Sequence, residues 1–222
     1  MDQLKDVDVE RNLLLQHPGT FLVAGSTGSG KTVLVRQLLH EWNKISTLNR
    51  TVRVHWCYGI SQSLHKEEIG GAVTSIKYEN GLPESSDGCD ILVLDDLQST
   101  AAGDARLSDI FTRFSHHRNV TVFFIVQNLF LQGKAMRNVS LNTHYIILLA
   151  SRRDRNQISR LASQLYPGET KHFLSAYKYA LSPDYGYLLI DLTPTTAEEY
   201  RLRTNIVPET YPIVVFQKQD GV

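Results

Sequence analysis

The stretch that decides the fold is residues 20–32, Thr20-Phe21-Leu22-Val23-Ala24-Gly25-Ser26-Thr27-Gly28-Ser29-Gly30-Lys31-Thr32. Its first five residues form an apolar run that predicts a buried strand. Residues 25–32 match the GxxxxGKT pattern of a phosphate-binding loop at every defined position. Apolar residues at helical spacing follow over 33–42. A strand before and a helix after the loop is the context that this motif requires.

The loop predicts a nucleoside triphosphate as the ligand. Its glycines allow a tight bend close to a ligand, and its backbone amides, from Gly25 to Thr32, point partial positive charge at phosphate oxygens. Lys31 can reach the β- and γ-phosphates, and the Thr32 hydroxyl can bind Mg²⁺. The sequence has no Asn-Lys-x-Asp stretch of the kind that selects guanine. We therefore expect ATP and Mg²⁺ as the cofactors.

Two carboxylates follow an apolar strand at 91–94. A carboxylate at the end of a strand beside the phosphate loop holds the Mg²⁺ shell in this class of site, and we assign that role to Asp95. Asp96 is then placed to orient or deprotonate the attacking water. Many such ATPases have Glu there, so Asp is a shorter variant. A capping or solvated Asp96 is the alternative.

A second polar strand end lies at Gln127. The strand 120–126 is expected to lie between the phosphate-loop strand and the acidic strand, so its tip can reach the γ-phosphate or the water. Gln127 is our first candidate for that contact and Asn128 the second. The alternative is that Gln127 and Asn128 have no role at the site and only begin the loop after the strand.

The pattern of elements predicts an α/β fold. Continuous apolar strands alternate with helical segments, which favours a mainly parallel central sheet covered on both faces. We expect a three-layer α/β/α P-loop NTPase of the RecA/ASCE type, with its site at the carboxyl ends of the strands. The 222 residues suit a single ATPase domain, 1–222. Within it we expect an N-terminal extension (1–17), a core (18–216) and a tail (217–222).

Composition limits the ways in which the protein can bind nucleic acid and the cellular compartments in which it is expected. Lys+Arg and Asp+Glu are both 23, so any nucleic acid must meet a local basic patch and not a global positive field. The two cysteines form no CxxC pair, and the charged N-terminus does not resemble a signal peptide. The longest apolar runs are too short to span a bilayer. We expect an intracellular protein that is not secreted and has no membrane partner.

Arginines near the end of the chain can stabilise transition-state charge, often from a neighbouring subunit. Arg153 is our first candidate for such an arginine finger. Arg152, Arg201 and Arg203 remain open as alternatives. The run at 151–155 can also contact the DNA backbone, or simply form a solvated, ion-paired cluster.

Several segments together resemble the genome-packaging ATPases of polinton-type viruses, adintoviruses and virophages. These are relatives of the poxvirus packaging ATPase and, more distantly, of the FtsK/HerA DNA pumps. The likeness runs from about residue 18 to 216. Beyond the phosphate loop and 91–96, it is carried by FIVQNLF at 124–130, RDRNQI at 153–158, and YLLID at 187–191 followed by RLRTNI at 201–206. Arg152 occupies a place where this family often has Pro.

The resemblance implies a homo-oligomeric ring, a pentamer or hexamer, that pumps double-stranded DNA into a preformed capsid. Its partners would be DNA and the viral capsid or portal-vertex proteins. Its location would be the host cell at the site of virion assembly, or the virion itself.

Two other functions stay open on the sequence. A small-molecule or nucleoside kinase is one, because the arginines at 152–155 can imitate a kinase lid; the acidic pair argues for hydrolysis instead. A non-catalytic P-loop adaptor is the other, although the loop and acidic motifs are intact. The tyrosines 177, 179, 185 and 187 are expected to be core and interface aromatics, with base stacking as the alternative.

Overall fold

The computed structural model describes residues 13–60, 67–84, 88–97, 104–115, 118–129, 134–151, 155–207 and 212–218. The strands are β1 (Thr20–Ala24), β2 (Val52–Tyr58), β3 (Val73–Asn80), β4 (Ile91–Asp95), β5 (Thr121–Val126), β6 (Tyr145–Leu149), β7 (Tyr187–Asp191), β8 (Leu202–Thr204) and β9 (Val214–Val215). The helices are α2 (Lys31–His40), α3 (Trp42–Ile45), α5 (Ala105–Asp109), α7 (Lys134–Leu141), α8 (Arg155–Leu165) and α9 (Thr170–Ala180), with a π-helical turn η2 (Ile110–Phe114) and a 3-10 turn η3 (Glu198–Tyr200). No described helix is both long and apolar enough to cross a lipid bilayer.

The strands form one sheet in the order β3-β2-β4-β5-β1-β6-β7-β8-β9. All pairings from β3 to β6 are parallel, whereas β7, β8 and β9 pair antiparallel. The mainly parallel α/β fold predicted from the sequence is therefore confirmed. β5 lies between β4 and β1, so the acidic strand and the phosphate-loop strand are separated by one strand.

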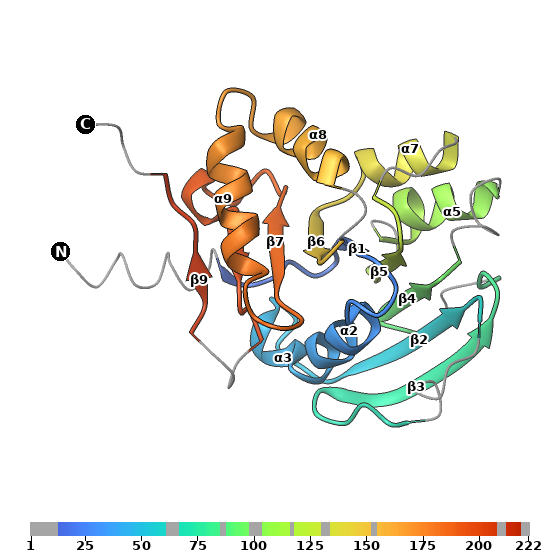
Figure 1. The fold of residues 1–222 in the computed structure, drawn as a ribbon. Coiled ribbons are helices and arrows are strands. Elements are labelled where there is room, and N and C mark those ends of the chain that lie inside the picture. Colours follow the sequence, from blue (N-terminus) through green and yellow to red (C-terminus); the bar gives the residue numbers. More distant parts are fainter. Residues whose placement is uncertain are drawn as a thin grey trace.

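Helices cover both faces of the sheet, which gives three layers (Figure 1). Strand β1 illustrates this arrangement, because its successive side chains point to opposite faces of the sheet and both faces need a covering layer. Phe21 and Val23 pack in the core with α2 and α3, while Leu22 and Ala24 pack in the core with α5, α7, α8 and α9. A strand buried on both faces needs the unbroken apolar run that the sequence has.

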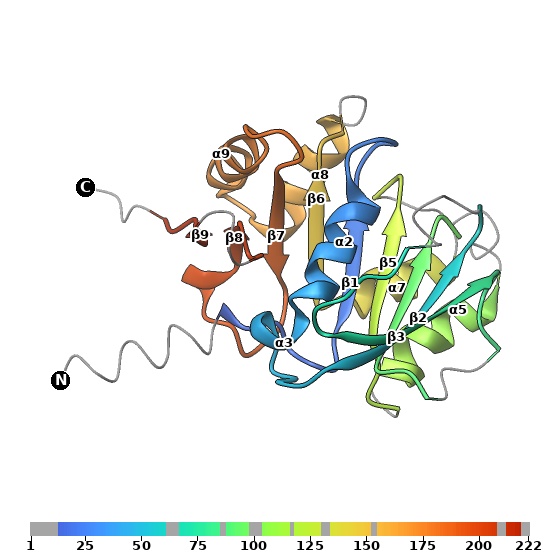
Figure 2. The ribbon, with the colours of Figure 1, turned by 90° about the horizontal axis from the view of Figure 1, so that it is seen from below.

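Stacked rings join the three central strands. Phe21 on β1 stacks on Phe123 of β5, with ring centroids 4.3 Å apart, and on Tyr145 of β6, at 4.5 Å. Figure 2 shows these strands side by side, with α2 in front of β1. Because ring pairs add to the free energy of area burial, this stack favours a fixed register of β1 against both neighbours.

Some elements differ from the sequence predictions. Residues 104–114, whose apolar spacing is typical of a single helix, form a short helix, α5, that widens into the π-helical turn η2. Helices α7 and α9 were not predicted; in α9 the inward positions are Phe173, Ala176 and Ala180, and small alanines give a weak apolar signal. Leu15, assigned to an N-terminal extension, is 1% exposed and its N–H donates to Ile45 O. The packed part of the chain thus begins before residue 18.

A buried ion pair fixes the antiparallel edge of the sheet. Arg203 Nη2 donates to Asp191 Oδ2 at 2.7 Å, and both side chains are 0% exposed. Hydroxyls of Thr193 and Thr196 also donate to this carboxylate, at 2.6 and 2.9 Å. Arg203 is therefore unavailable to a nucleotide, which removes it from the arginine-finger candidates. Arg201, which pairs with Glu198 at 3.2 Å, is partly exposed.

We expect Arg203→Ala to lower the free energy of unfolding by about 3–5 kcal/mol, because it leaves the Asp191 carboxylate buried without a counter-charge. Arg201→Ala is the matched control and should lower it by about 1 kcal/mol or less, because that pair is reached by solvent. Urea unfolding followed by circular dichroism measures both. Equal losses for the two variants would contradict a special role for the buried pair.

Candidate active site

The phosphate loop presents an uncapped helix N-terminus. Gly30 precedes α2 in the left-handed conformation, with φ 91°, and no side chain caps the helix. The first turn of α2 contains no acidic residue. The first N–H groups of a helix have no intrahelical partner and carry partial positive charge. The start of α2 is therefore suited to bind an anion such as phosphate.

Lys31 is held inside the loop. Its Nζ donates to Gly25 O and to Ser26 O, both at 2.8 Å, and the residue is 9% exposed. Burial lowers the pKa of Lys31, while the nearby carboxylates of Asp95 and Asp96 act in the opposite direction. The ammonium group is thus positioned between the loop and the acidic strand, where a phosphate can replace the carbonyl contacts.

The side chains at Thr32 and Asp95 fit a Mg²⁺ ion. Thr32 Oγ1, on α2, donates to Asp95 Oδ2, at the end of β4, over 3.3 Å. Hydroxyl and carboxylate oxygens are the donors that this ion prefers. In the same loop the buried Ser29 hydroxyl has no hydrogen-bond partner among the described residues. The oxygen donors present at this edge of the sheet are therefore those that a metal–phosphate complex requires.

Asp96 and Gln127 meet at neighbouring strand ends. Gln127 Nε2 donates to Asp96 Oδ1 at 3.0 Å. Asp96 has φ 54°, a left-handed conformation that few residues other than glycine adopt without strain. Gly59 makes room for this turn, because a Cβ there would lie 2.4 Å from Asp96 O. The backbone therefore turns sharply after β4 and presents the second carboxylate toward β5.

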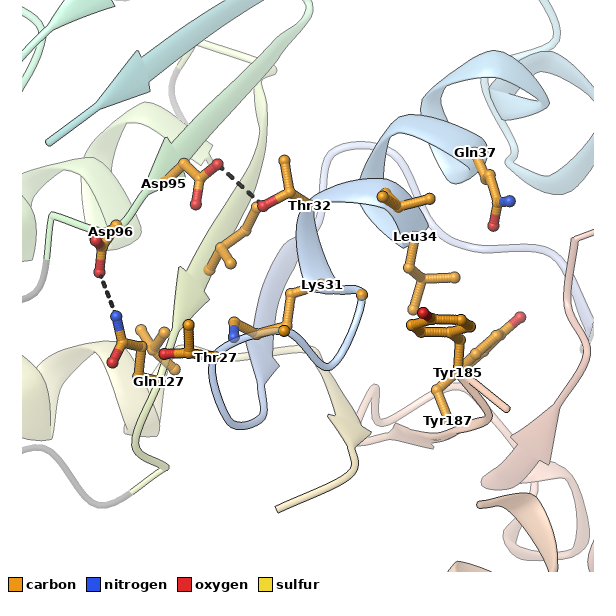
Figure 3. A pocket seen from close by; sticks show the side chains of 15 residues that line it. Thr27, Lys31, Thr32, Leu34, Gln37, Asp95, Asp96, Gln127, Tyr185 and Tyr187 are labelled. Atoms are coloured by element: carbon orange, nitrogen blue, oxygen red, sulfur yellow. Dashed lines mark hydrogen bonds between the residues drawn. The ribbon is translucent and has the colours of Figure 1, made fainter. Parts of the chain in front are cut away.

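These groups line one cavity of about 610 Å³. Figure 3 shows Asp96 and Gln127 at one end, Lys31 and Thr32 in the middle, and Tyr185 at the other end. Among the described lining residues, Lys31 is the only basic side chain. The described residues that line the cavity are Thr27, Gly28, Gly30, Lys31, Thr32, Val33, Leu34, Gln37, Asp95, Asp96, Ile125, Val126, Gln127, Tyr185 and Tyr187.

The structure thus brings together most side chains that the sequence singled out, although their chemical roles stay predictions. Asn128, the second candidate beside Gln127, does not line the cavity among the described residues. Arg152 and Arg153 lie outside the described residues.

Sequence reasoning missed Gly59, and it did not place Tyr185 at this site, because a core or interface position was expected for that tyrosine with base stacking only as the alternative. Gly59 comes directly after a buried strand, which is a weak signal of a tight approach. Tyr185 stands in an Asp-Tyr-Gly turn, where a large aromatic residue is unusual.

The sequence matches no protein-family model, and it matches no curated protein. Among solved structures, the chain is similar to the genome packaging NTPase B204 from Sulfolobus turreted icosahedral virus 2 in complex with ATPγS: 11% identity, TM-score 0.50, covering 79% of this chain and 93% of that one. It is also similar to ATPases 2 and 3 of EssC from Geobacillus thermodenitrificans: 11% identity, TM-score 0.50, 92% of this chain but 41% of that one. At such identities the likeness shows the P-loop NTPase fold.

We expect Asp96→Asn to lower the rate of ATP hydrolysis about a hundredfold or more while affinity for ATP is kept, because an amide cannot take a proton from water. Asn tolerates the left-handed backbone at this position and can still bond Gln127. Steady-state phosphate release and equilibrium binding of ATPγS measure the two effects. Asp109→Asn, on α5 outside the cavity, is the control; undiminished hydrolysis in Asp96→Asn would assign Asp96 a purely structural role.

Proposed function

We propose that this protein is an ATP-hydrolysing motor that translocates double-stranded DNA as a homo-oligomeric ring and packages a viral genome into a preformed capsid. The observation that carries the hydrolytic part is the contact between Asp96 and Gln127 at strand ends beside Lys31 and Thr32. The motor part rests on the late sequence segments that resemble packaging ATPases.

The residues of the cavity support hydrolysis in the following way. The amides at the start of α2 and the Lys31 ammonium bind and orient the triphosphate. Asp96 accepts the proton of the attacking water, and Gln127 holds that carboxylate in position. Mg²⁺, held by Thr32 and Asp95, would offset phosphate charge.

A second positive charge near the γ-phosphate is expected to come from another subunit. The described lining residues supply only Lys31 as a cation. Arginine fingers of P-loop motors are often provided in trans, and Arg153 remains our candidate, with Arg152 and Arg201 as alternatives. This arrangement favours a closed ring, in which each site is completed by its neighbour, and the resemblance to packaging ATPases implies five or six subunits.

DNA and capsid are proposed as partners on two grounds. The resemblance over about 18–216 is to enzymes that pump double-stranded DNA, and B204, which shares the fold, is a genome packaging NTPase. The formal net charge of zero means that DNA contact depends on a local basic surface. The place of action would be inside the host cell, where virions assemble.

The test of the motor is the ATPase rate of the full chain with and without double-stranded DNA, beside native mass measurement. We expect DNA to raise the rate severalfold and the mass to correspond to a closed ring. Lys31→Ala should lose the activity in both conditions, because the triphosphate then lacks its main side-chain cation. A rate that is indifferent to DNA would contradict the motor.

The kinase alternative is tested in the same preparation. A screen of nucleosides and small hydroxyl compounds as phosphoryl acceptors should give no phosphorylated product. Transfer of the γ-phosphate to such an acceptor, without release of free phosphate, would replace hydrolysis by phosphoryl transfer as the function.

Arg153→Ala tests the finger. We expect hydrolysis in the assembled variant to fall about a hundredfold or more, because transition-state charge is no longer neutralised. In equimolar mixtures with wild-type subunits the rate should fall below half, because each variant subunit disables the site of its neighbour and a ring whose sites act in turn stalls at a disabled site. Arg160→Ala, on α8, is the control. Normal hydrolysis by assembled Arg153→Ala would exclude this residue as the finger.

A further inference from the structure

The two ends of the cavity differ in chemistry. One end holds the carboxylates of Asp95 and Asp96 with Gln127, and the phosphate loop forms the middle. The other end is lined by Gln37 and Tyr185. Since the metal and the attacking water belong with the carboxylates, the γ-phosphate points to that end. The nucleoside of a bound triphosphate must then extend toward Tyr185. This inference rests on the nucleotide-binding part of the proposed function.

The cavity lining includes exposed apolar surface beyond the phosphate loop. Tyr185 is 73% exposed and Val33 is 47% exposed, and both are among the few large apolar side chains that the described residues leave to solvent. A cavity of about 610 Å³ falls within the 300–1,000 Å³ typical of small-molecule sites, so there is room for a nucleoside beyond the phosphates. A planar aromatic ring of a ligand can bury such exposed apolar surface at the rim of the cavity.

The ring of Tyr185 lies directly against the phosphate loop. A Cβ added at Gly30 would come within 2.9 Å of Tyr185 Cδ1, so only glycine leaves room for this approach. Figure 3 shows Tyr185 at the same end of the cavity as Tyr187. Tyr187, at the start of β7, is buried, and its hydroxyl accepts from Ile206 N at 2.9 Å. The exposed aromatic side chain available to a ligand at this end is therefore Tyr185, because Tyr187 is buried.

The backbone at Tyr185 is unfavourable for a tyrosine. Its φ is 59°, in the left-handed region that Gly, Asn and Asp occupy most readily. The turn is tight as well: Gly186 N donates to Pro183 O at 3.1 Å, and a Cβ at Gly186 would meet Ala180 O. A bulky aromatic residue in such a turn costs stability that Asn would not, and strain of this kind gathers where a side chain has a binding role.

We propose that Tyr185 is the stacking platform for the purine base of the nucleotide bound at the phosphate loop. Every base has a π-face, and an aromatic side chain stacks on it without reading its edges. The platform therefore contributes affinity for ATP and GTP alike. It acts on the base and leaves phosphate recognition to Lys31 and the start of α2.

Calorimetric titration of the full chain, with Mg²⁺ and without DNA, tests the platform using ATPγS, GTPγS and inorganic tripolyphosphate. We expect Tyr185→Ala to weaken both nucleotides about tenfold and tripolyphosphate less than twofold. Tyr185→Phe should bind all three like wild type. Tyr179→Ala, another exposed tyrosine on α9 outside the cavity, is the matched control and should bind all three like wild type.

Tyr185→Asn separates binding from folding. Because Asn suits φ 59°, this variant should melt at the wild-type temperature or above it, yet show the same selective loss of nucleotide affinity. Unchanged ATPγS binding in Tyr185→Ala, or an equal loss of tripolyphosphate, would overturn the platform. Because the assay contains no DNA and needs no hydrolysis, its outcome is independent of the motor: a DNA-insensitive ATPase can still show the selective loss, and a DNA-stimulated one can lack it.

Discussion

The uncapped N-terminus of α2 is the constraint on which the rest of the structure depends. Gly30 supplies no side chain to satisfy the first N–H groups, and the first turn has no carboxylate. Helix ends left in this way are stabilised by an external anion. The loop before the helix and the lysine within it are arranged around the same anion site. Everything else at the carboxyl edge of the sheet serves to surround that point with groups of suitable charge.

The parallel half of the sheet provides those groups. Because β1, β5 and β4 run in one direction, their ends meet at one edge, and Lys31, Gln127 and Asp95 arrive there from distant parts of the sequence. The stack of Phe21 between Phe123 and Tyr145 favours one register for β1. A shift of one residue would turn every side chain of that strand to the opposite face. The register of β1 that packs the core is thus also the register that positions the phosphate loop at the edge of the sheet.

The sequence allowed the phosphate loop, the acidic strand and the polar strand end to be predicted, because each combines a continuous apolar run with an abrupt change to polar residues. It did not reveal the reversal at β7, since a buried antiparallel strand has the same apolar run as a parallel one. The buried pair of Arg203 with Asp191 was missed for a related reason: an arginine in a short strand looks like a surface residue until its partner is known. The position of Tyr185 beside the phosphate loop could not be predicted, because it results from a contact between segments that are distant in the sequence.

The antiparallel pairing of β6 with β7 has a further consequence. Tyr187 lies opposite Leu149, so the start of β7 reaches the edge at which β6 ends, and the turn after α9 arrives beside the phosphate loop. The chemistry of phosphate and the contact with the base are therefore supplied by segments about 150 residues apart, one in the core of the fold and one in a surface turn. Surface turns accept substitution more readily than packed strands. Affinity for the nucleoside can consequently change through substitutions in this turn without altering the residues that contact the phosphates.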